Sequence, residues 1–137
     1  MKGQGGCFCG AVRYVCSEAP VYVYHCHCRD CQKASGAAFA TCLVMSESAV
    51  GVTAGQPREF MVKSADGNSV TRQFCGDCGS PLFTRAAILP DFRIVKAGTL
   101  DDASWLEPTM HLWTSTKQPW LALADQLQCF EKQPPVE

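Results

Sequence analysis

The stretch GGCFCG, residues 5–10, and its distant counterpart FCGDCG, residues 74–79, decide the fold of this chain. Each places two cysteines beside glycines, as in a metal knuckle, a bend whose backbone N–H groups point at two cysteine sulfurs. Two knuckles together supply four thiolates, which is the ligand set of a closed tetrahedral zinc site. We therefore expect a structural Zn²⁺ that closes a long loop and contributes folding free energy directly, held by Cys7, Cys9, Cys75 and Cys78.

Three further cysteines lie between the two knuckles, in the stretch HCHCRDC at residues 25–31. Three protein ligands with one position left for another molecule are typical of catalytic zinc, so Cys26, Cys28 and Cys31 could hold an ion that binds a thiol substrate. The same spacing also allows a second structural zinc, completed by His25, His27 or a distant residue. The residues alone leave both interpretations open, and either one predicts two Zn²⁺ per chain.

Metal binding is the preferred use of these cysteines because disulfides fit neither the spacing nor the expected compartment. Two cysteines in a C-x-C stretch rarely bridge each other, since the geometry is poor. The start, MKGQGGCFCG, lacks the apolar segment of a signal peptide, so we expect a cytoplasmic protein, in which thiols stay reduced. The remaining cysteines are expected to pack as small apolar side chains, and they are Cys16, Cys42 and Cys129.

Length and composition indicate one globular domain over residues 1–137, with a core at about residues 6–121 and a frayed tail at 131–137. Apolar residues make up 47% and charged residues 18%, which is the composition of a folded chain. Lys plus Arg is 12 and Asp plus Glu is 13, and two Zn²⁺ on seven thiolates would add 4 − 7 = −3. No nucleic-acid partner is therefore expected, and no membrane span either, because no run of about 18 apolar residues is present.

Short alternating segments separated by glycine-rich turns indicate a mainly β domain. The run ADGN at residues 65–68 is a strong turn signal, so residues 58–63 and 69–74 are expected to form a hairpin. A short helical turn is expected at residues 29–35, where Gly36 provides the stop. Further strands are expected at residues 11–16, 39–45, 81–85, 93–97 and 110–114.

Four stretches, in this order, resemble the glutathione-dependent formaldehyde-activating (GFA) family, also called the centromere protein V domain family: GGCFCGAVRY, HCHCRDCQKASGAAF, FCGDCGSPLF and MHLWTSTKQPWL. The resemblance runs from about residue 6 to residue 121. It implies a fold of twisted antiparallel sheets, similar to the Mss4-like β-tent, with two zinc sites. Carried over to this sequence, it implies a structural zinc on Cys7, Cys9, Cys75 and Cys78 and a catalytic zinc on Cys26, Cys28 and Cys31.

The family's named activity joins formaldehyde and glutathione to give S-(hydroxymethyl)glutathione and breaks that C–S bond in reverse, which is carbon–sulfur lyase chemistry. The partners implied are a small thiol and an aldehyde. Three thiolates make zinc electron-rich, so we assign the metal to the thiol rather than to the carbonyl. The attack leaves charge on the aldehyde oxygen, for which the candidate proton donors are His27, Ser35 and His111.

Two side chains on the expected helix, Arg29 and Lys33, could attract an anionic substrate. Two other functions remain open from the residues. One is a zinc-stabilised binding module with a saturated middle site and no catalysis. The other is a redox or metal sensor, in which the middle cysteines release zinc on oxidation.

Overall fold

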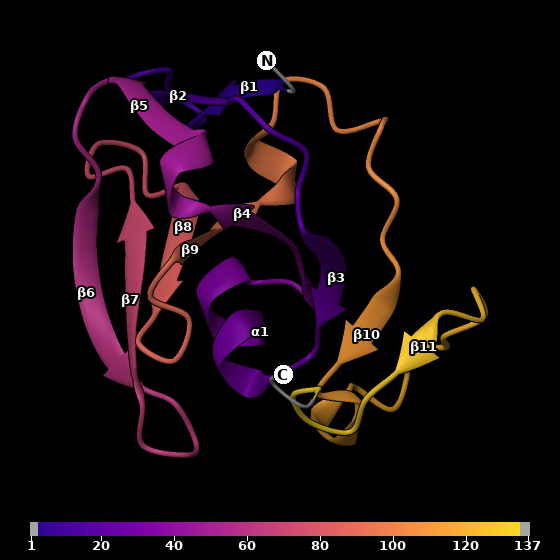
Figure 1. Ribbon diagram of the computed structural model, residues 1–137. Helices are drawn as coiled ribbons and strands as arrows, with labels where there is room; N and C mark the ends of the chain where they lie inside the picture. The colour runs from indigo at the N-terminus through magenta and orange to yellow at the C-terminus, as the bar shows by residue number, and fades with distance from the viewer. Residues whose placement is uncertain (1–2, 135–137) are drawn as a thin grey trace.

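Residues 3–134, the part of the chain that the computed structural model describes, form a three-stranded sheet, an eight-stranded sheet and one short α-helix (Figure 1). The small sheet has the order β1-β2-β5, and the large sheet has the order β11-β10-β3-β4-β9-β8-β7-β6. The elements are β1 (Gly3–Gly6), β2 (Arg13–Cys16), β3 (Tyr22–Cys26), α1 (Arg29–Ser35), β4 (Ala40–Ser46), β5 (Val50–Ala54), β6 (Arg58–Lys63), β7 (Ser69–Phe74), β8 (Pro81–Ala86), β9 (Phe92–Lys96), β10 (Met110–Leu112) and β11 (Gln128–Cys129).

The main core lies between the small sheet and one face of the large sheet. Strand β4 contributes Leu43 and Met45 to this core, and both are fully buried. From the small sheet, Tyr14 packs edge-to-face on Phe83 of β8, with the ring centroids 5.0 Å apart. Gly5 lies where the sheets meet, and a Cβ there would come within 2.4 Å of the Tyr14 hydroxyl, so no larger residue fits.

The opposite face of the large sheet carries α1. Helix α1 begins after Cys28, whose sulfur accepts a hydrogen bond from the Cys31 N–H at 3.2 Å, and it ends at Gly36 in the left-handed conformation with φ of 69°. Figure 1 shows α1 between the two ends of the large sheet, β6 on one side and β11 on the other. In the described part of the chain, no helix has the length and hydrophobicity needed to cross a bilayer.

The expected mainly β fold is confirmed, and the hairpin at 58–63 and 69–74 forms with the predicted boundaries. The sheets are not wholly antiparallel, because β10 pairs in parallel with both β3 and β11. The strand expected at 110–114 ends at Leu112, because Trp113 adopts a positive φ of 60° and turns the chain out of the sheet. Strands β1, β3, β5 and β11 were not anticipated.

The tail expected to fray at residues 131–137 is instead attached over its first residues. The carbonyl of Glu131 accepts a hydrogen bond from the Ser115 N–H at 3.2 Å, and the carbonyl of Lys132 accepts one from the Trp113 N–H at 3.2 Å. Backbone hydrogen bonds of this kind hold a terminal segment against the domain. The rest of that prediction, residues 135–137, lies outside the described residues.

An ion-pair cluster links β8, β9 and the turn after β4. Glu47 accepts hydrogen bonds from Arg93 at 2.5 Å and 3.1 Å, and it also pairs with Arg85. Arg93 is 8% exposed, and its guanidinium lies 5.1 Å from the centroid of the Phe83 ring. The hydrogen bonds from Arg93, and then those from Arg85, lower the pKa of Glu47. The cluster therefore provides a buried guanidinium with its counter-charge.

Replacing Glu47 with Gln should lower the free energy of unfolding by about 1–2 kcal/mol near pH 7. The estimate lies below the value for a fully buried pair because solvent screens the partly exposed Glu47. Since the Glu47 pKa is lower in the folded state, its contribution is complete above the unfolded pKa of about 4.3 and is lost as the pH falls through the folded value. Urea denaturation of both proteins between pH 3 and 7 should show the difference shrinking in acid. A matched Glu18→Gln change at an exposed position should leave stability unchanged, and a pH-independent Glu47→Gln effect would contradict the account.

Candidate metal centres

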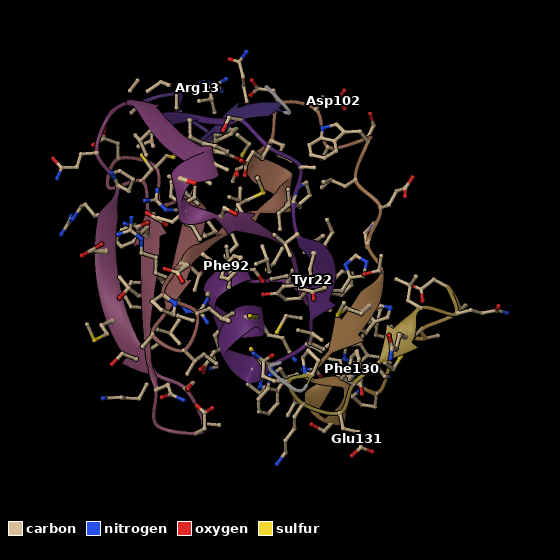
Figure 2. The ribbon with its side chains drawn as sticks, in the orientation of Figure 1. Arg13, Tyr22, Phe92, Asp102, Phe130 and Glu131 are labelled. Atoms are coloured by element: carbon tan, nitrogen blue, oxygen red, sulfur yellow. The ribbon has the colours of Figure 1, made fainter. Side chains whose placement is uncertain are left out.

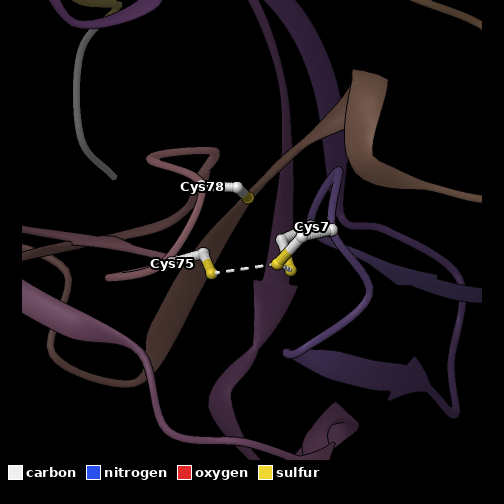
Figure 3. Close-up of side chains that lie close together, drawn as sticks. Cys7, Cys75 and Cys78 are labelled. Carbon is white, nitrogen blue, oxygen red and sulfur yellow. Dashed lines mark hydrogen bonds between the residues drawn. The ribbon is translucent and has the colours of Figure 1, made fainter.

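The two knuckles meet in the folded chain and bring their four sulfurs together. The Sγ atoms of Cys7, Cys9, Cys75 and Cys78 all lie within 4.8 Å of one another. The Cys7 and Cys9 sulfurs are 3.6 Å apart, and those of Cys9 and Cys75 are 3.8 Å apart. Figure 3 shows Cys75 and Cys78 on one loop and Cys7 on another, with the side chains of Cys7 and Cys75 directed toward each other.

This spacing fits tetrahedral zinc. A Zn–S bond of about 2.3 Å implies tetrahedral sulfur–sulfur distances of about 3.8 Å. The surroundings favour the thiolate at two of the four sulfurs. At Cys7 the Val12 N–H donates to the sulfur at 3.2 Å. A hydrogen bond from the Ser80 hydroxyl lowers the pKa of Cys78 to about 5. These four cysteines, termed the knuckle group, could therefore hold a metal ion.

Three of the four knuckle cysteines belong to the main core or pack against it, whereas Cys9 is exposed. Cys7 is 7% exposed and Cys75 is 1% exposed, and both belong to the apolar cluster between the sheets, against which Cys78 packs. Cys75 follows directly after β7, and Cys7 follows directly after β1. An ion here would join the small sheet to the large one.

A second group forms at the start of α1, where the sulfurs of Cys26, Cys28 and Cys31 also lie within 4.8 Å of one another. Cys26 ends β3, and Cys28 is the N-terminal cap of α1, so the strand-to-helix turn alone brings the three together. Among residues 3–134 no fourth donor joins this middle group. Zinc on three cysteines keeps one coordination position for a molecule from solution.

Cys31 also lines a cavity of about 310 Å³, here called the cationic cavity, between α1 and strands β7 to β9. Arg72 of β7 and Lys96 of β9 line the same cavity. Hydrogen bonds from Cys26 and Cys28 lower the pKa of Cys31, and the positive charges of Lys96 and Arg72 lower it further. The cavity therefore favours a negatively charged sulfur or a negatively charged ligand beside it.

A hydrogen-bonded chain of Asp125, His111 and His27 lies next to the middle group. His111 Nε2 is 2.9 Å from Asp125 Oδ2, and His111 Nδ1 is 2.9 Å from His27 Nε2. The carboxylate accepts the His111 Nε2–H, which leaves His111 Nδ1 to accept from His27 Nε2–H. Burial, followed by the nearby His111, lowers the pKa of His27 to about 4, so the ring is neutral at pH 7. None of the three histidines predicted from the sequence, His25, His27 and His111, belongs to the middle group. His25 Nδ1 instead lies 2.8 Å from the Thr41 hydroxyl.

Several sequence expectations for this site change in the structure. Arg29 hydrogen-bonds Gln32 Oε1 and Lys33 is exposed, and neither lines the cationic cavity, where Arg72 and Lys96 supply the charge. Ser35 lines that cavity, although its hydroxyl donates to the Cys31 carbonyl at 2.7 Å. Of the three cysteines expected to be packed, Cys16 and Cys42 are each 1% exposed, whereas Cys129 is exposed because it lies on the edge strand β11.

The sequence model of the glutathione-dependent formaldehyde-activating enzyme family matches residues 2–116. This chain belongs to that family. A relative from Halomonas elongata, named "Putative glutathione-dependent formaldehyde-activating enzyme", is 28% identical over 138 residues, covering 96% of this chain and 88% of the relative. The family assignment made from the four sequence stretches is thus confirmed.

A solved structure shares the fold. The crystal structure of a Rhodobacter sphaeroides protein superposes with a TM-score of 0.58, at 20% sequence identity, and covers 77% of this chain and 91% of that chain. At this identity the likeness concerns the fold alone. The arrangement of sheets described above therefore has a counterpart in a solved structure.

Loss of a knuckle cysteine should have a larger effect than loss of a middle cysteine. We expect Cys75→Ser to release one zinc and unfold the domain, because Cys75 is buried in the main core. Cys28→Ser should release the other zinc and leave the fold intact, because the middle group lies outside that core. Metal analysis and thermal melts, with and without chelator, measure both effects. Cys129→Ser is the matched control and should keep two zinc ions. Equal melting temperatures of all three variants would contradict the assignment of a structural role to the knuckle group alone.

Proposed function

We propose that this chain is a zinc-dependent carbon–sulfur lyase that makes or breaks adducts of a thiol and an aldehyde, including S-(hydroxymethyl)glutathione. The observation that supports it most directly is the middle group, three convergent cysteines beside a cavity with two positive side chains. The family membership and the name of the Halomonas elongata relative support the same substrates. The knuckle group is then the structural site of the same protein.

The chain's own residues would supply binding and charge. Zn²⁺ held by Cys26, Cys28 and Cys31 would keep a substrate thiol as its thiolate near pH 7. Arg72 and Lys96 would bind the carboxylates of an anionic thiol such as glutathione in the cationic cavity. The thiol S–H adds across the carbonyl: a C–S bond and an O–H bond form as the S–H bond and the C=O π bond break. Nothing is oxidised or reduced.

The middle group supports the enzyme over a saturated binding module. A structural zinc needs four protein ligands, and the described chain brings only three donors within 4.8 Å of one another at this site. The imidazole of His27, which lies between Cys26 and Cys28 in the sequence, is hydrogen-bonded through Nε2 to His111 Nδ1 at 2.9 Å. Lys96 Nζ lies 3.7 Å from Cys42 Sγ. Because Cys42 belongs to the same apolar cluster as Cys26 and Cys31, this positive charge lies close to the middle group.

Glutathione mixed with formaldehyde should exchange faster in the presence of the zinc-loaded protein than in its absence. Magnetisation-transfer NMR measures the rate at equilibrium. The Cys28→Ser variant should show no excess exchange while retaining one zinc and wild-type circular dichroism. Absence of excess exchange in the wild type, with two zinc ions bound, would refute the lyase proposal for this substrate pair.

Replacing Lys96 with Gln should lower kcat/KM for glutathione about tenfold, the equivalent of one charge-assisted hydrogen bond of roughly 1.4 kcal/mol. The effect should be much smaller with 2-mercaptoethanol, which has no charge for Lys96 to bind. Lys33→Gln is the matched control, since Lys33 is exposed on α1 and does not line the cavity. Equal losses with both thiols, or equal losses in both variants, would remove Lys96 from the binding site.

A further inference from the structure

A second hollow, about 550 Å³ in volume and here called the apolar groove, lies on the same face of the large sheet as α1. Tyr22, Val44 and Ile94 line it from three adjacent strands, in register across β3, β4 and β9. One wall is the loop between β8 and β9, and the other is the C-terminal segment with Phe130. Figure 2 labels three of the residues that line the groove, Tyr22, Phe92 and, on the C-terminal segment, Phe130.

The apolar groove borders the apolar cluster that contains two of the middle cysteines. Tyr24 and Ile94 line the groove and also pack against the cluster that contains Cys26, Cys31 and Cys42. Leu112 lines the groove and is the register partner of Cys26 in the parallel pair of β10 and β3. On this face of the sheet, the row next to Tyr22, Val44 and Ile94 consists of Tyr24, Cys42 and Lys96. Lys96 lines the cationic cavity. The middle group thus lines the cationic cavity through Cys31 and shares packing neighbours with the apolar groove.

The two hollows differ in chemistry, and this difference determines which part of a substrate each can hold. Among residues 3–134, none of the side chains lining the apolar groove is charged, and Gln133 is the only amide. A carboxylate placed there would lose its hydration without a charged partner, which is strongly unfavourable. The cationic cavity has Arg72 and Lys96 for that purpose. An anionic thiol therefore belongs in the cationic cavity, and the apolar groove is left for the other reactant.

Exposed apolar surface in the apolar groove indicates a ligand. Tyr22 is 55% exposed, Val21 49% and Ile88 39%, and all three line this one hollow. Contiguous apolar surface of this kind marks binding sites, and the volume lies within the range of roughly 300–1,000 Å³ typical of small-molecule pockets. Formaldehyde, whose carbonyl carries only hydrogens, would leave the groove empty.

We propose that the apolar groove receives the alkyl or aryl substituent of the carbonyl reactant, so that the substrates of this chain include thiol adducts of apolar aldehydes larger than formaldehyde. This inference rests on the proposed lyase function. The bonding change is the same, an S–H bond added across C=O with no oxidation. What the groove adds is selection of the aldehyde by the apolar area that it buries.

The first test is a chain-length series. Glutathione is equilibrated with propanal, butanal, hexanal or octanal, and the protein-catalysed exchange is measured by NMR. Because aldehydes in this series have similar electrophilicity, kcat/KM should rise up to roughly fourfold per methylene, the value for full CH₂ burial, until the groove is filled. Two changes at Ile88, on the β8–β9 loop, should abolish this gradient: Ile88→Asp by adding a charge and Ile88→Trp by filling the space. Met61→Asp, at an exposed position on β6 outside the groove, should retain it.

The second test measures binding without turnover. Calorimetry compares S-hexylglutathione with S-methylglutathione, two unreactive thioethers with the same charged part. The hexyl compound should bind at least tenfold more tightly to the wild type and to Met61→Asp, and the preference should be lost in Ile88→Asp.

The outcomes separate this inference from the lyase proposal. Exchange with formaldehyde together with a flat aldehyde series overturns the apolar-carbonyl class and leaves the lyase. Tight hexyl binding without any exchange supports the apolar groove as a ligand site and removes the lyase. Equal binding of the two thioethers overturns the groove as a substrate site. Light scattering tests whether a second copy of the chain occupies the groove. If the wild type is a dimer and Ile88→Asp converts it to a monomer, the groove is a dimer interface and the inference is overturned.

Discussion

The two-residue repeat of β4 is the constraint on which the rest of the structure depends. Leu43 and Met45 point into the core beneath the small sheet, whereas Cys42 and Val44 point to the face that carries α1. Both faces are buried at this strand, so a slip of one residue would exchange them and place the wrong side chains in both. The register of β4 with β3 and β9 therefore fixes which strand positions face the middle cysteines.

Local signals in the sequence predicted the elements that are determined locally. The turn at residues 65–68 and the cap at Gly36 gave correct boundaries because the backbone there needs the conformations that these residues favour. Strand β1, with the sequence GQGG, has no β-propensity, and it exists because Gly5 allows the close approach to Tyr14. The parallel pairing of β10 depends on contacts across more than 80 residues, such as Thr116 with the His27 carbonyl, which no local pattern records.

The same distinction applies to the candidate sites. Cysteine spacing predicted both sulfur groups, because C-x-C and C-x-x-C already place ligands within reach of one ion. Arg29 and Lys33 were candidates for attracting an anionic substrate because they are close to the middle cysteines in sequence. The charges that line the cavity beside Cys31 come from Arg72 and Lys96, which are close to it only in space. Asp125 was missed for a similar reason, since it lies in a loop without a motif and is identified only by its contact with His111.

The separation of the two knuckles along the chain also affects how the protein is made. Cys9 and Cys75 are 66 residues apart, so at 5–20 residues per second the first pair of thiols leaves the ribosome roughly 3–13 s before its partners. Until then the small sheet has no large sheet to cover it, because Cys7 and Cys75 are buried in the same core. During that interval Cys7 and Cys9 are exposed on the nascent chain and can be oxidised. Binding of a metal ion or of a chaperone during synthesis would protect them.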